Sequence, residues 1–100
     1  MNHKDNHMIS PKEIHANAVR KGFWDNTPPF AQAMMLVVTE CAEAVEADRQ
    51  GDKEHIGEEI ADAVIRLFDL AEGFGYDLEA EIARKHAINL TRPRKHGKRY

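Results

Sequence analysis

The sequence has little of what disulfide-stabilised, secreted or membrane proteins need. Its one cysteine, Cys41, excludes an internal disulfide and fits a reducing cytoplasm. No apolar run approaches the length of a membrane span, and residues 1–10 contain no hydrophobic segment of a signal peptide. We therefore expect a single cytoplasmic domain over residues 1–100, with a flexible start at 1–9 and no membrane partner. Cys41 falls on an apolar helix stripe, which predicts a buried, inert thiol.

The chain also lacks the excess of Lys and Arg over Asp and Glu that is typical of a nucleic-acid-binding domain. It carries 14 Lys and Arg against 17 Asp and Glu, for a net charge of −3. The middle of the chain is acidic, whereas the last ten residues, TRPRKHGKRY, are rich in Lys and Arg and contain no acid. We expect no nucleic acid polymer as a partner, so the basic end calls for a different explanation.

Alternating strand patterns are absent as well, and apolar residues recur with helical spacing throughout. Capping residues and Pro or Gly punctuation predict four helices, at about 10–22, 27–49, 52–74 and 77–91. Ser10 and Glu13 form a capping box, and Asp77 caps the last helix. The predicted fold class is all-α, a helical bundle of about four to five helices per chain.

Three of these helices are apolar over a wide arc. The stripe of the second helix comprises Phe30, Ala33, Met34, Val37, Val38, Cys41, Ala44 and Val45. The stripe of the third comprises Ile56, Ile60, Ala63, Val64, Leu67, Ala71 and Phe74. On the fourth helix, Leu78 and Ile82 are expected to point inward. Because so short a chain offers few partners for such faces, we expect an obligate homodimer or homotetramer.

Two pairs of acidic residues interrupt the apolar faces. Glu40 and Glu43 project to one side of the second helix, and Glu59 and Asp62 do the same on the third. If these helices pack antiparallel through the short turn between them, the two pairs face each other. Converging carboxylates need cations, and all-oxygen ligands favour Mg²⁺ or Mn²⁺ over Zn²⁺. The alternative is that these acids lie on solvated helix faces, where such spacing is common.

A second group of charged residues is basic. Lys85, Asn89 and Arg92 lie at i, i+4 and i+7, on one face of the last helix and its exit. The residues that follow include Arg94, Lys95, Lys98 and Arg99. Cationic groups beside a metal-loaded acidic cluster are what a polyphosphate substrate requires. The alternative is a solvated basic tail.

The three motifs together resemble a known family. E-C-A-E at 40–43, E-I-A-D at 59–62 and K-H-A-I-N-L-T-R-P-R-K-H-G-K at 85–98 resemble the MazG-like all-α nucleoside triphosphate pyrophosphohydrolases. That family's pattern is ExxE, a spacer, ExxD and a C-terminal Lys-x-x-x-Asn-x-x-Arg stretch. The resemblance covers about Pro29 to Lys98. Before Pro29, where such proteins tend to build part of the base pocket, the match is poor.

The resemblance implies an Mg²⁺-dependent hydrolase acting on acid anhydrides. The implied reaction converts a (deoxy)nucleoside triphosphate and water to the monophosphate and pyrophosphate, for nucleotide-pool control or housecleaning. The implied metal ligands are Glu40, Glu43, Glu59 and Asp62, and Glu40 is also the residue expected to orient or deprotonate the attacking water. The implied contacts to substrate phosphate and sugar are Lys85, Asn89, Arg92 and Lys98.

Aromatic residues make up only 7% of the chain, and two of them lie in the loop GFWDNTPP. Trp24 is able to stack on a nucleobase, and we include it among the candidate substrate-binding residues. The alternative is that Phe23 and Trp24 plug one end of the bundle. His15 and Asn17 on the first helix are further candidates for hydrogen bonds to base edges.

Two rival functions remain at this point. Phosphoribosyl-ATP pyrophosphohydrolase has the same fold and related acidic motifs, although the Arg-Pro-x-x-His-Gly-Lys tail resembles the MazG-like group more closely. Outside enzymes, the chain could be a non-catalytic helical oligomerisation module with a basic tail. The acidic pairs on otherwise apolar faces speak against that second rival.

Overall fold

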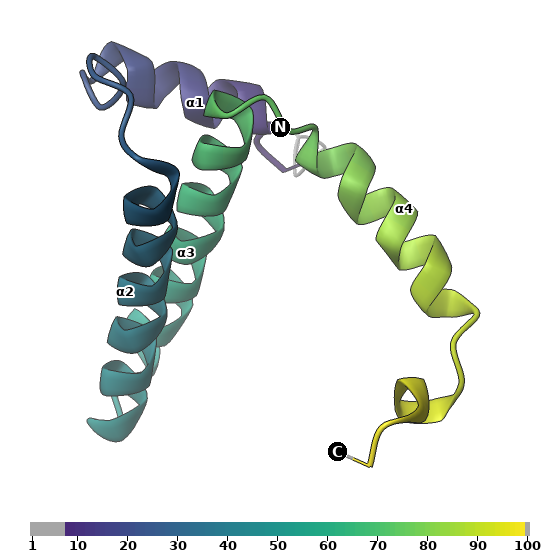
Figure 1. Ribbon diagram of the computed structural model, residues 1–100. Coiled ribbons are helices and arrows are strands. Elements are labelled where there is room, and N and C mark those ends of the chain that lie inside the picture. Colours follow the sequence, from purple (N-terminus) through teal and green to yellow (C-terminus); the bar gives the residue numbers. More distant parts are fainter. Residues whose placement is uncertain (1–7, 100) are drawn as a thin grey trace, which may run out of the picture.

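The computed structural model, which describes residues 8–99, confirms the all-α fold. Its elements are α1 (Pro11–Arg20), α2 (Phe30–Arg49), α3 (Lys53–Gly73), α4 (Leu78–Leu90) and a short 3₁₀ helix, η2 (Arg94–Gly97) (Figure 1). No strand occurs within the described residues. Of residues 1–9, which the sequence predicts to be flexible, residues 1–7 lie outside the described part of the chain.

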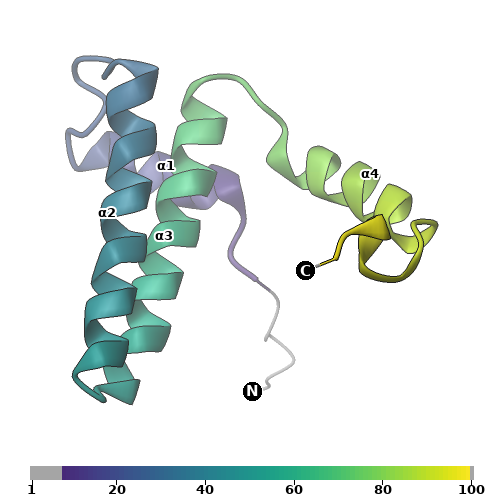
Figure 2. The same cartoon turned by 60° about the horizontal axis from the view of Figure 1, so that its bottom comes forward.

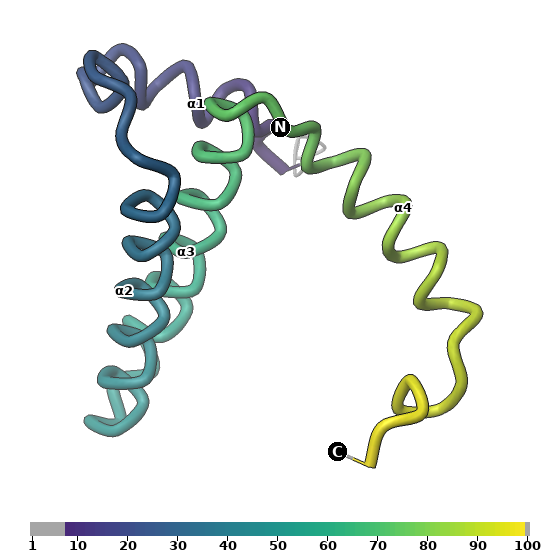
Figure 3. Tube along the Cα trace, viewed as in Figure 1, coloured from purple at the N-terminus to yellow at the C-terminus, as the bar shows by residue number. Residues whose placement is uncertain are grey.

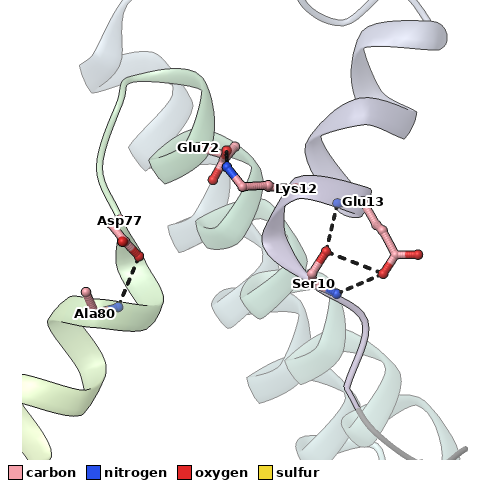
Figure 4. A network of polar contacts seen from close by, with 6 residues as sticks. All are labelled: Ser10, Lys12, Glu13, Glu72, Asp77 and Ala80. Carbon is pink, nitrogen blue, oxygen red and sulfur yellow. Dashed lines mark hydrogen bonds and ion pairs between the residues drawn. The ribbon is translucent and has the colours of Figure 1, made fainter.

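Local sequence explains where the helices begin. The Ser10 hydroxyl accepts a hydrogen bond from the Glu13 amide at 3.1 Å, and the Glu13 carboxylate accepts one from the Ser10 amide at 3.2 Å. This is the predicted capping box. Asp77 caps α4 by accepting a hydrogen bond from the Ala80 amide at 3.1 Å, also as predicted (Figure 4). Between α2 and α3, Gly51 adopts a φ of 72°, which permits the tight turn.

The central helix of the molecule is α3. Because the turn at Gly51 is short, α2 and α3 run antiparallel side by side along their length (Figures 1 and 3). The first helix crosses the end of α3 near Gly73. There the Lys12 ammonium donates a hydrogen bond to the Glu72 carboxylate at 3.1 Å, which joins α1 to α3 (Figure 4). The facing sides of α2 and α3 therefore form the core of the chain.

That core is thin. Its buried apolar residues are Val37, Ala47, Ala63, Phe68, Leu70 and Ala71, and none of the described side chains is fully buried. Within one chain the apolar stripes of α2 and α3 are only partly covered, since Val38 is 49% and Val45 and Ile60 are each 55% exposed. Cys41 is likewise exposed rather than buried. The reason is that α2 has only α3 beside it, so one helix covers only part of each wide apolar arc.

The fourth helix leads away from the other three (Figures 1 and 2). None of its residues is buried, and Ile82, which was predicted to point inward, is exposed. The radius of gyration is 16.3 Å, against about 13 Å for a compact chain of 100 residues. A single copy of the chain therefore leaves α4 without a surface to pack on. No helix within residues 8–99 combines the length and apolarity that crossing a membrane requires.

Candidate metal centre

Three carboxylates from the two acidic motifs converge between α2 and α3. Glu40 and Glu43 come from α2 and Glu59 from α3, and each offers an oxygen that lies within 4.8 Å of the other two. The antiparallel packing of α2 and α3 brings them together, because residues three apart share one side of a helix. The structure thus places three of the four predicted metal ligands in one group.

The three carboxylates differ in their surroundings. Glu40 is buried, Glu43 is exposed, and Glu59 is half-buried with an Oε1 atom that has no hydrogen-bond partner. The pKa of the Glu59 carboxyl is raised from 4.5 to about 7, mostly by burial and in addition by the nearby Glu40 and Glu43 carboxylates. An unpartnered buried oxygen beside two other carboxylates suits a hard divalent cation such as Mg²⁺, whose ligands are oxygens. The residues present therefore fit the cation that the sequence predicts.

Arg66 is a member of the site that sequence analysis missed. Its Nε donates a hydrogen bond to Glu40 Oε2 at 2.7 Å, from α3 to α2. This hydrogen bond and the positive charge of the guanidinium hold the pKa of Glu40 below its usual range, against the opposing effect of burial. Glu40 and Arg66 are 26 positions apart, so only the packing of α2 on α3 reveals the pair. In the sequence, the only sign that Arg66 belongs to the site is that it follows the Glu-x-x-Asp motif by one helical turn.

Beside the carboxylates lies a groove of about 510 Å³. Glu40 lines it together with Asp62, the fourth predicted ligand, which does not join the group of three. Another part of the lining comes from α1 and the loop after it and includes Asn17, Phe23 and Trp24. Asn17 and Trp24 therefore share one groove with Glu40 and Asp62. The lining does not include His15, Glu43 or Glu59.

Trp24 is held in this part of the lining by a residue that the sequence did not single out. The Trp24 indole donates a hydrogen bond from Nε1 to Asp69 Oδ1 at 3.0 Å, and His15 Nδ1 lies 2.8 Å from the same oxygen. The rings of Trp24 and His15 meet edge to face, with centroids 5.0 Å apart. Trp24 therefore packs at the end of the helical pair and also lines the groove. Its stacking on a nucleobase stays a prediction.

The predicted basic residues lie elsewhere in the single chain. Lys85 and Asn89 are on α4, and the Arg92 guanidinium donates a hydrogen bond to Asn89 Oδ1 at 3.4 Å. Lys85, Arg92 and Lys98 are exposed. The groove lining contains none of these residues. Within one copy, α4 leads them away from the carboxylates, so the structure does not bring the acidic and basic motifs together.

Comparison with known proteins adds no family assignment. No family model matches the chain, and comparison with curated proteins and with solved structures found no match.

Proposed function

We propose that the protein is an Mg²⁺-dependent nucleotide pyrophosphohydrolase that cleaves nucleoside triphosphates, with either sugar, to monophosphate and pyrophosphate. One observation carries the proposal: the group formed by Glu40, Glu43 and Glu59 adjoins, through Glu40, a groove that Trp24 and Asn17 also line. Carboxylates suit the cations that accompany a triphosphate, and an indole and an amide suit a nucleobase. The groove thus has carboxylates suited to the metal-bound triphosphate of a nucleotide and an indole and an amide suited to its base.

In this proposal each residue has a defined task. Glu40, Glu43 and Glu59 hold the cation, with Asp62 beside them on the groove wall. Mg²⁺ at such a site supplies positive charge for the phosphate oxygens and lowers the pKa of a bound water. Glu40 is buried and its pKa is lowered, so it is ionised at neutral pH and is able to accept a hydrogen bond from the attacking water.

We further propose that the working form is a homodimer or homotetramer. The chain exposes 7952 Å², whereas a compact monomer of this size would expose roughly 5,800 Å². The excess of about 2,150 Å² per chain doubles to about 4,300 Å² for a pair, which lies within the roughly 2,000–5,000 Å² that obligate homodimer interfaces bury in total. The exposed side chains include Val38, Val45, Ile60 and Ile82, which a second copy would cover.

Contact between two copies would also bring the acidic and basic motifs together. The region from Lys85 onward is basic and the groove is acidic, so α4 of one copy has the charge to dock beside the groove of another. Light scattering tests this directly, with a mass of two or four chains as the expected result. A well-folded species with the mass of one chain would rule out the assembly.

The activity itself is tested with a nucleotide panel. Each ribo- and deoxyribonucleoside triphosphate is incubated with the protein and Mg²⁺, and pyrophosphate release is followed, with EDTA as the control. Pyrophosphate from at least one nucleotide, and none in EDTA, is the expected result.

Phosphoribosyl-ATP belongs in the same panel, because hydrolysis of that compound alone would favour the rival histidine-biosynthesis activity. Absence of turnover with every compound, from a protein that forms a stable oligomer, would favour the non-catalytic oligomerisation module.

A further inference from the structure

Arg66 lies between the carboxylate group and the groove. It belongs to α3, one turn after Asp62, and lines the groove together with Glu40 and Asp69. Its Nε is 2.7 Å from Glu40 Oε2, and the side chain is 44% exposed while that of Glu40 is 12% exposed. A long, partly exposed side chain thus reaches a buried carboxylate from the groove side. This geometry leaves the guanidinium free to move into the groove without disturbing the core.

Glu40 has two possible cationic partners in the proposed enzyme. In this structure, the Arg66 guanidinium compensates its charge, while Glu59 Oε1 has no hydrogen-bond partner. A divalent cation that binds Glu40, Glu43 and Glu59 would bring a second positive centre to the same carboxylate. Two cations on one carboxylate repel each other, so the stronger one weakens the hold of the other. Metal binding and the Arg66–Glu40 pair therefore oppose each other.

A displaced Arg66 has a suitable partner in the groove. An Arg guanidinium stays protonated at all working pH values and presents several donors that match phosphate oxygens. Its side chain already borders the space next to the carboxylates, where the phosphates of a bound nucleotide would lie. Two acids, Asp62 and Asp69, line the same groove, but Asp69 is already hydrogen-bonded to Trp24. A phosphate group that binds together with the metal attracts the Arg66 guanidinium more strongly than these carboxylates do.

Building on the proposed function, we propose that Arg66 is an exchangeable counter-ion: it pairs with Glu40 in the metal-free protein and turns to the substrate phosphates once the carboxylates hold a divalent cation. Arg66 would then keep the acidic group in order before metal arrives and bind substrate afterwards. A fixed structural ion pair, the alternative, would neither compete with metal nor affect phosphate binding.

Two binding measurements on the intact protein separate these cases. The first is Mn²⁺ affinity by calorimetry, in the absence of nucleotide, for wild type, Arg66→Gln and Arg66→Lys. Removing the competing charge in Arg66→Gln should tighten Mn²⁺ binding about tenfold, since a charged hydrogen bond no longer has to be broken. Arg66→Lys keeps the charge but lacks Nε, so its affinity should lie between the other two.

The second measurement is the affinity for inorganic pyrophosphate at saturating Mg²⁺. Arg66→Gln should weaken it about tenfold, because the phosphate loses a charged donor. The matched control is Arg49→Gln, which removes the same charge from the exposed last residue of α2, outside the groove lining. This control should leave both affinities near the wild-type values.

Each contrary result has a definite meaning. Mn²⁺ affinity that is unchanged or lower in Arg66→Gln would overturn the competition, and unchanged pyrophosphate affinity would overturn the phosphate contact. If Arg66→Gln fails to fold, Arg66→Lys decides by the same criteria. If wild type binds Mn²⁺ and hydrolyses nucleotides, either contrary result would overturn the role of Arg66 and leave the proposed function standing. Failure of the wild type to bind Mn²⁺ would defeat the proposed function as well.

Discussion

The indole ring of Trp24 lies directly against the backbone of Gly73, so that a Cβ at position 73 would overlap the ring. Gly73 is the last residue of α3, and Trp24 comes from the loop that precedes α2. The contact is reinforced by the hydrogen bond to Asp69 and by an edge-to-face contact with Phe74, with centroids 5.6 Å apart. A groove wall held on several sides is ordered before a ligand binds, which lowers the entropy cost of binding.

Gly73→Ala should therefore displace Trp24. Overpacking at such a contact costs about 1–3 kcal/mol, which outweighs the gain of up to about 1 kcal/mol in helix propensity. Trp24 is the only tryptophan, so its fluorescence reports on the ring without interference, and urea unfolding reports on the stability. The control is Gly57→Ala on the same helix, where an added Cβ meets nothing within 4 Å and should stabilise the protein. A Gly73→Ala variant that is as stable as Gly57→Ala, with an unchanged spectrum, would contradict this packing.

The stability of the metal-free protein should fall as the pH rises from about 4.5 to about 7. Over this range an unfolded chain has lost the Glu59 proton, whereas the native protein still holds it, because the native pKa is raised from 4.5 to about 7. The native state therefore binds more protons, and the free energy of unfolding decreases with pH. Urea unfolding in EDTA at about pH 5 and about pH 7.5 measures the difference.

Glu59→Gln supplies the control, since it removes the titrating group. His55, whose pKa is raised by its hydrogen bond and ion pair with Asp52, also loses stabilisation as the pH rises through its native pKa. The larger contribution from Asp52 remains in Glu59→Gln, and only the smaller effect of Glu59 on the pKa of His55 is lost, so the difference between the two proteins reports mainly on Glu59. Equal pH dependence in both would show that Glu59 does not carry the effect.

Much of this architecture follows from local sequence. The caps at Ser10 and Asp77 and the turn at Gly51 involve residues within a few positions of each other, and such signals are readable without a structure. The spacing of Glu40 and Glu43 likewise places both on one side of α2.

The remainder depends on contacts between distant positions. The hydrogen bond of Arg66 to Glu40 joins residues 26 apart, and that of Trp24 to Asp69 joins residues 45 apart. Nothing in the local pattern distinguishes these polar residues from solvated ones. The exposure of Ile82 was missed for a related reason: amphipathic spacing shows which face of α4 is apolar but not whether the same chain covers it.

Mg²⁺ should raise the thermal stability of the protein. The three converging carboxylates repel one another without a cation, and a ligand that binds only the native state stabilises it by mass action. At about 100 times the dissociation constant this amounts to about 2.7 kcal/mol, enough to raise Tm by several degrees. Calorimetric melting in EDTA and in excess Mg²⁺ measures the shift. Glu59→Gln should reduce the shift, while Glu79→Gln on the exposed face of α4 should retain it; identical Tm values for wild type in both buffers would count against the site.

Lys85→Ala should lower kcat/KM while leaving Mg²⁺ affinity near that of wild type. Lys85 and Asn89 lie one turn apart on α4, so if both contact substrate they act as a unit and their losses should not add. Steady-state kinetics of Lys85→Ala, Asn89→Ala and the double variant test this, with metal titrations alongside. A solvated lysine would instead change stability and activity only slightly. Wild-type efficiency in all three variants would mean that the substrate is held without α4.

The most direct test of the central claim is the identity of the phosphorus products, followed by ³¹P NMR in wild type and Glu43→Gln. We expect wild type with Mg²⁺ to convert a nucleoside triphosphate to equal amounts of monophosphate and pyrophosphate. Glu43→Gln keeps the size of an exposed side chain but removes a ligand charge, so it should stay folded and lose activity about a hundredfold or more. Orthophosphate as the first product, no Mg²⁺-dependent cleavage of any nucleotide, or undiminished turnover in Glu43→Gln would contradict the account.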